Sequence, residues 1–104
     1  MEINRTSGEI ITLEEAKKYT QSFQKLYPNE KKAFFVGRDP LMKILENSEC
    51  MGIRIYNGYN DEDSQSNKVL IGVNSNGDDM TEDVILEKLV PCPPICSGGT
   101  GGLY

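Results

Sequence analysis

The last fourteen residues of the chain, 91–104, constrain its fold more than any other segment. They hold two of the three cysteines, three of the five prolines and four of the ten glycines. Proline removes a backbone donor and glycine loses much conformational entropy on folding, so this composition disfavours a helix or a central strand. The sequence therefore predicts a single α+β domain over 1–90, followed by a Cys/Pro/Gly-rich tail over 91–104.

The length of 104 residues fits one domain with a modest hydrophobic core. Because the chain has no apolar run of about 18 residues, no membrane-spanning helix is expected. Residues 1–5 lack the apolar segment of a secretory signal. The predicted compartment is therefore the cytoplasm, where thiols are kept reduced.

Charge and composition exclude several classes of function. The net charge of −5 arises in the second half, where residues 53–104 carry three basic and eight acidic side chains. Such a surface repels phosphate, so neither nucleic acid nor a membrane is an expected partner. The chain also has no histidine, the commonest general base and metal ligand. We therefore predict a protein that is not an enzyme and has no cofactor.

The first half of the sequence predicts two helices and a short strand. Thr12 and Glu15 form a capping box ahead of a helix over about 13–27. Before that helix we expect an irregular arm or a short edge strand at Ile10–Ile11. A strand is predicted over 33–36. Asp39 then reads as the N-cap of a second helix that ends near residue 47 and buries Leu41, Ile44 and Leu45.

The second half predicts a hairpin and one ambiguous segment. Residues 52–59 and 68–73 alternate as strands, joined by a polar loop over 60–67. Ile53 and Ile55 are assigned to the inner face together with Val69, Ile71 and Val73. Asn76-Gly77 is a strong turn signal. Residues 81–90 fit a short helix or a strand, and we favour the helix.

These elements predict the α+β fold class. We expect a small, mostly antiparallel sheet of three to four strands with the two helices packed on one face. The extended Cys/Pro/Gly tail follows this body.

The cysteine pair Cys92 and Cys96 is the first candidate site. Their spacing is one residue longer than a redox Cys-x-x-Cys motif, and Pro93 and Pro94 lie between them. A cytosolic location favours reduced thiols with a packing role, while a disulfide remains open. A metal site with Cys50 as third ligand is the weaker alternative. The two prolines favour an extended segment suited to a partner's groove.

The end of the tail is the second candidate. Leu103 and Tyr104 form an apolar anchor after two Gly-Gly pairs, on what is otherwise expected to be a flexible terminus. Such an anchor suits a hydrophobic pocket on a partner.

Arg54 and Tyr56 form the third candidate. They alternate with the inward isoleucines, which places them on an exposed sheet face, and Arg beside Tyr is common at binding surfaces. A solvated sheet face with a cross-strand partner such as Leu70 is the interpretation that we favour for this pair. Residues 74–83 only loosely resemble a calcium loop, and a polar turn is the better interpretation.

Several sequence runs together resemble a group of short uncharacterised proteins of Bacteroidetes-type bacteria. The runs are 35–39, 44–45, 50–58, 70–73 and 92–96, of which Gly-Ile-Arg-Ile-Tyr and Cys-Pro-Pro-Ile-Cys are the most particular. The resemblance implies a bacterial origin and carries no catalytic residue over to this chain.

The sequence thus predicts a small non-enzymatic protein-interaction module that presents its C-terminal tail. The expected partner is another protein, and self-association through a sheet edge is also open. The alternative is a carrier whose tail is covalently processed or holds a thiol or metal site.

Overall fold

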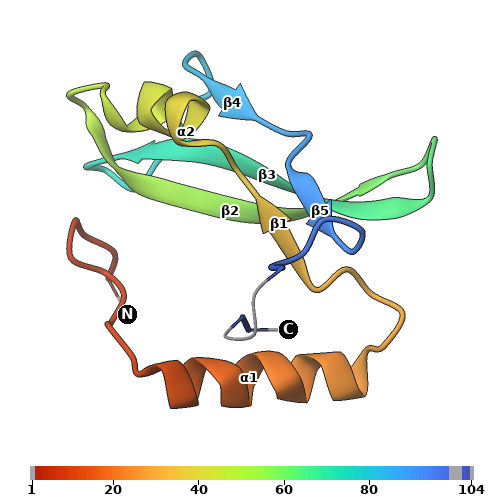
Figure 1. The fold of residues 1–104 in the computed structure, drawn as a ribbon. Coiled ribbons are helices and arrows are strands. Elements are labelled where there is room, and N and C mark those ends of the chain that lie inside the picture. The colour runs from red at the N-terminus through yellow and green to blue at the C-terminus, as the bar shows by residue number, and fades with distance from the viewer. Residues whose placement is uncertain (1, 99–101, 104) are drawn as a thin grey trace. The chain divides into compact units, whose positions relative to one another are not determined.

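The computed structural model describes residues 2–98, 102 and 103 (Figure 1). Within these residues the chain forms two helices and five strands. In order they are α1 (Leu13–Leu26), β1 (Ala33–Phe35), α2 (Arg38–Leu45), β2 (Cys50–Asn60), β3 (Gln65–Asn74), β4 (Ile85–Leu86) and β5 (Val90–Cys92). They belong to two compact units, one made of residues 2–8 and 36–89, the other of residues 9–35 with the described part of 90–104.

The first unit is built on an antiparallel sheet with the strand order β2-β3-β4. The β2–β3 hairpin is longer than predicted, because its ladder runs to the pair Asn60–Gln65 and leaves only residues 61–64 as the turn. Polar residues that we assigned to a loop therefore extend both strands. Ser64 takes a positive φ of 54° in the turn.

The register of this hairpin corrects the predicted inner face. Arg54 lies opposite Ile71 and Ile55 lies opposite Leu70. Directly opposed residues share a face of an antiparallel pair, so Ile71 belongs with Arg54 rather than with the isoleucines. By the same pairing Leu70 is not the partner of Arg54. Leu70 and Ile71 are both buried, because the central strand β3 is covered on its two faces.

Helix α2 covers the sheet face that carries Gly72 (Figure 1). Ile44 is only 1% exposed, and its Cγ2 atom lies 3.1 Å from where a Cβ on Gly72 would stand. Ile44 is thus confirmed as a core residue, whereas Leu45 is exposed. The helix begins two residues earlier than predicted: its N-cap is Gly37, and Asp39 lies inside the first turn.

The chain after β3 turns back along the same strand. Asn74 and Gly77 close the predicted turn, with a backbone hydrogen bond of 2.9 Å and a φ of +85° at Gly77. Asp79 then bridges to Val73 on the edge of β3 that faces away from β2. The helix that we favoured over 81–90 is wrong. Within it Ile85–Leu86 forms β4, which pairs with Leu70 and Ile71.

The second unit contains α1 and an antiparallel pair of strands, β1 and β5. The Thr12 hydroxyl accepts a hydrogen bond from the Glu15 amide, which confirms the predicted start of α1. Ile10 and Ile11 form no strand, and both are exposed. β5 begins at Val90 and includes Pro91, so the first tail residues pair with β1 at a sheet edge, where proline is tolerated.

The α+β class is confirmed, with the strands divided between a three-stranded and a two-stranded sheet in place of one sheet. Within the first unit α2 contacts the three-stranded sheet, and α1 belongs to the other unit. Among the described residues neither helix is long and apolar enough to cross a bilayer.

Candidate functional site

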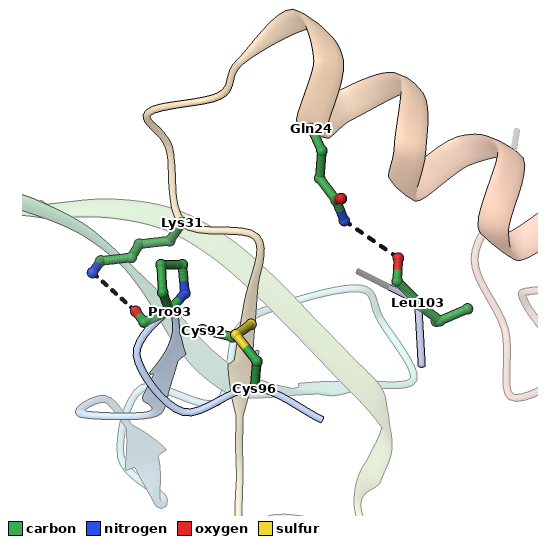
Figure 2. Close-up of a disulfide and its surroundings, with 6 residues drawn as sticks. All are labelled: Gln24, Lys31, Cys92, Pro93, Cys96 and Leu103. Atoms are coloured by element: carbon green, nitrogen blue, oxygen red, sulfur yellow. Dashed lines mark hydrogen bonds between the residues drawn. A yellow bond between two sulfur atoms is a disulfide. The ribbon is translucent and has the colours of Figure 1, made fainter. Parts of the chain in front are cut away.

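A disulfide between Cys92 and Cys96 closes a short loop at the end of β5 (Figure 2). Cys92 is buried and pairs with Ala33 of β1, so the loop starts from a fixed position. The sequence left a disulfide open but favoured reduced thiols. In the structure Cys92 and Cys96 form the disulfide. Cys50 carries a free thiol and belongs to the other unit.

Three hydrogen bonds hold this loop to the β1–β5 pair. The Lys32 amide donates to the Cys92 carbonyl at 2.6 Å, and the Ile95 amide donates to the Pro91 carbonyl at 3.2 Å. The Lys31 ammonium donates to the Pro93 carbonyl at 3.0 Å (Figure 2). The loop is therefore fixed at both ends and in its middle.

The outer side of the loop is apolar and open to solvent. Pro93 and Pro94 are exposed, and the Ile95 side chain keeps 64% of its surface accessible. We define residues 92–96 as the disulfide loop. It presents an aliphatic side chain from a backbone that the disulfide and the hydrogen bonds hold in place.

An apolar groove lies beside the disulfide loop within the same unit. Its volume is about 560 Å³, which is in the size range of ligand pockets. The groove is lined by hydrophobic side chains of β1, β5 and the tail, and by two polar side chains of α1. They include Phe34, Phe35, Val90, Ile95, Leu103, Thr20 and Gln24.

The end of the described tail contacts α1 across this groove. The Leu103 carbonyl accepts a hydrogen bond from the Thr20 hydroxyl at 2.7 Å. It accepts a second one from the side-chain amide of Gln24 at 3.3 Å (Figure 2). The predicted anchor thus lies against its own chain, with the Leu103 side chain 42% exposed. Tyr104, the other predicted anchor residue, lies outside the described residues.

A second cluster forms in the other unit around Arg54 and Tyr56. Their alternate positions on β2 place them on the face that Val73 shares, and the bridge from Val73 to Asp79 brings that acid to the same face. Arg54 Nη1 donates to Asp79 Oδ1 at 2.5 Å, and the Tyr56 hydroxyl donates to Asp79 Oδ2. One carboxylate therefore holds both predicted binding residues.

The hydrogen bonds within this cluster shift the pKa values of Asp79 and Tyr56 in opposite directions. The Tyr56 hydroxyl, and then the Arg54 guanidinium, lower the pKa of Asp79 below 3.8. The bond to Asp79 raises the pKa of Tyr56 above 10.0. Proton transfer catalysis needs pKa values near the operating pH. Both shifts move the pKa values further from neutral pH, and the three side chains join β2 to residue 79.

Sequence reasoning missed Asp79 because it lies in a polar run, 74–83, that we considered only as a turn or a calcium loop. The Asn74 side-chain oxygen accepts hydrogen bonds from the amides of Asn76 and Asp78, at 2.9 and 3.1 Å, as in a polar turn. In the described part of the chain, no three acidic, cysteine or histidine side chains are placed to hold a metal.

Comparison of the chain with protein-family models, with curated proteins and with solved structures found no significant match. The resemblance to Bacteroidetes-type proteins therefore stays a prediction from the sequence.

Proposed function

We propose that this protein is a small, non-enzymatic interaction module that binds another protein through the disulfide loop at the start of its tail. The observation that carries the proposal is the exposure of Ile95 on a loop whose two ends are covalently joined. The partner chemistry that fits is a protein surface with an apolar pocket of the size of one aliphatic side chain.

Pre-organisation supports this proposal. Binding costs about 0.5–1.5 kcal/mol for each flexible side chain that becomes ordered, and more for a flexible backbone. The disulfide and the bonds from Lys31 and Lys32 already fix the loop backbone. A partner therefore orders little more than the Ile95 side chain when it binds.

The proposal that the module is not an enzyme rests on the absence of histidine from the sequence and on the chemistry of the one ionic cluster. Arg54, Tyr56 and Asp79 bond to one another and hold pKa values unsuited to proton transfer at neutral pH.

The compartment is linked to the redox state of the loop. Disulfides persist in oxidising compartments and are rare in the cytosol. The cytoplasmic location stays a prediction, and within the cytosol we expect the Cys92–Cys96 pair to be largely reduced. The binding function proposed here belongs to the oxidised protein and therefore requires an oxidising compartment in place of the predicted cytoplasm.

The test is an affinity capture from the organism that encodes the chain, with Ile95→Lys as the variant. We expect the wild-type protein to retain a specific partner that the variant loses. Ile85→Lys is the matched control, because Ile85 is 49% exposed but lies on β4 in the other unit. A partner that binds all three proteins equally overturns the role of the disulfide loop.

The captured partner also permits a direct measurement of affinity. Titration of the purified partner should give a dissociation constant at least ten times weaker for Ile95→Lys, since an apolar pocket excludes a charge. Reduction of the disulfide should weaken binding as well, because the loop then becomes flexible. Equal affinities for the oxidised and reduced protein contradict the argument from pre-organisation.

A second candidate is a carrier whose tail undergoes covalent or thiol chemistry. The observation that favours it is the disulfide itself, in which Cys92 is buried while Cys96 is partly exposed and lines the groove. Intact mass of the native protein, with and without reductant, tests this candidate. A truncated or modified tail supports the carrier, and a full-length, unmodified mass contradicts it.

A further inference from the structure

Strand β2 forms one edge of the three-stranded sheet (Figure 1). It spans eleven residues and pairs with β3 on one side. None of the described strands pairs with its other side. An unpaired strand edge is a template for another strand, and a strand this long offers many unpaired backbone groups.

Proteins usually block such edges with proline, lysine, bulges or short strands. In β2 the pairing irregularity lies between Cys50 and Gly52, at the start of the strand. Residues 53–60 contain no proline, no lysine and one charged side chain, Arg54, which is already paired with Asp79. The open edge over 53–60 thus lacks the usual protection.

The same part of β2 carries exposed apolar side chains. Ile55 is 63% and Tyr59 is 61% exposed, and the two residues lie on the same face because they are four positions apart in a strand. A second strand along this edge would cover both side chains.

We propose that the occupant of this edge is the β2 strand of a second copy of the chain, paired antiparallel about a two-fold axis at Asn57. Asn57 then lies opposite Asn57 of the second copy, and Ile55 lies opposite Tyr59 twice. Aromatic residues opposite β-branched residues stabilise antiparallel pairs. The product is a continuous six-stranded sheet with two-fold symmetry.

Charge complementarity supports this register. It places the exposed acidic turn of one copy, residues 61–63, next to residues 51–53 of the other. Arg5 and Arg54 line a cavity with this segment of β2. The acidic turn of each copy therefore comes near Arg5 of the other, while Arg54 stays paired with Asp79, and the two acidic turns lie at opposite ends of the interface. A register centred on Arg54 instead sets two arginines opposite each other.

The first test is the mass of the purified full-length protein in solution, from micromolar to millimolar concentration. We expect a species of twice the 11.6 kDa of the single chain to become populated as the concentration rises. Ile55→Lys should remain monomeric, because it places a charge opposite Tyr59 in each copy and removes the apolar contact between the two side chains. Ile85→Lys, at the opposite edge of the sheet and 49% exposed, should still dimerise.

The second test examines the register by cross-linking in a Cys50→Ala background with a short thiol-specific reagent. Asn57→Cys should cross-link to itself between copies, whereas Tyr59→Cys should not, since it lies opposite Ile55. A monomer at every concentration overturns the proposal. So does a dimer that Ile55→Lys leaves intact, and equal cross-linking at positions 57 and 59 overturns the register.

Discussion

Tyr56 donates its phenolic hydrogen to Asp79, which leaves the second oxygen of the same carboxylate to Arg54. The tyrosine and the arginine lie on β2, along one edge of β3, whereas the aspartate bridges to the other edge of β3, on the same face of the sheet. The cluster therefore ties both edges of β3 together through side chains, in addition to the backbone ladder.

This relationship predicts how stability depends on pH. Folding lowers the pKa of Asp79 below its ordinary value of 3.8. The ionised Asp79 therefore stabilises the fold above pH 3.8, and this stabilisation is lost as the pH falls through the pKa of the folded protein. Folding raises the pKa of Tyr56 above its ordinary value of 10.0. The protonated Tyr56 therefore stabilises the fold below pH 10.0, and this stabilisation is lost as the pH rises through the pKa of the folded protein. Denaturant unfolding of wild type and Asp79→Asn should thus differ most between these limits.

The control for this experiment is Asp78→Asn, which removes the same charge at the adjacent, exposed position. NMR titration of the Asp79 carboxyl gives a second measurement. Tyr56→Phe should move the pKa of Asp79 upward, because the tyrosine hydroxyl is the largest cause of its shift. An unchanged carboxyl titration in Tyr56→Phe contradicts the assigned cause.

The disulfide should stabilise the unit that contains it. Closing a loop of five residues lowers the entropy of the unfolded chain and contributes about 2 kcal/mol to the free energy of unfolding. Cys92→Ala/Cys96→Ala should lose this amount, and the Lys32 amide, which donates to Cys92, should exchange its hydrogen faster. Reductant should destabilise the wild type and leave the double variant unaffected; equal effects on both would argue against this role.

Gly72 should tolerate no larger side chain. A Cβ at this position meets Ile44, Cys50 and Met80 at 3.1–3.3 Å, and the site is buried. Gly72→Val overpacks the contact between α2 and β3 and should reduce the free energy of unfolding by about 1–3 kcal/mol. Gly52→Val is the matched control, since no atom lies within 4 Å of a Cβ at that glycine. Equal losses in the two variants would show that strand glycines matter for another reason.

The contact between the tail and α1 should depend on Thr20. Thr20→Val removes the hydroxyl that donates to the Leu103 carbonyl at 2.7 Å and leaves only the longer bond from Gln24. The loss of a hydrogen bond costs about 0.5–1.5 kcal/mol, enough to shift the Leu103 carbonyl resonance and increase its local motion. Ser22→Ala, an exposed change on the same helix, should leave the resonance unchanged. A Thr20→Val spectrum with an unshifted Leu103 signal contradicts the contact.

Local signals in the sequence were sufficient for some elements. The start of α1 follows from Thr12 and Glu15, because a capping box satisfies helix amides that lie within four residues of it. The turn at Asn76-Gly77 depends in the same way on the positive φ that glycine adopts easily. These features need no knowledge of distant residues.

Two features could not be predicted from the sequence alone. One is which side chains of β3 face α2, and the other is whether residues 81–90 form a helix or a strand. Leu70 and Ile71 are both apolar and both buried, so alternation could not show which of them faces α2. The segment that includes Ile85 is apolar enough for a helix or a strand. It forms a strand because Ile85 pairs with Ile71 of β3, a contact that the local sequence does not reveal. The role of Asp79 depends likewise on a bridge to Val73.

The two units are interleaved along the chain, because the backbone passes from one to the other at residues 8–9, 35–36 and 89–90. A protease that cuts one of these connections leaves two others intact. Neither unit is a continuous stretch of the gene, so recombination cannot transfer the disulfide loop to another protein together with the whole of its supporting unit.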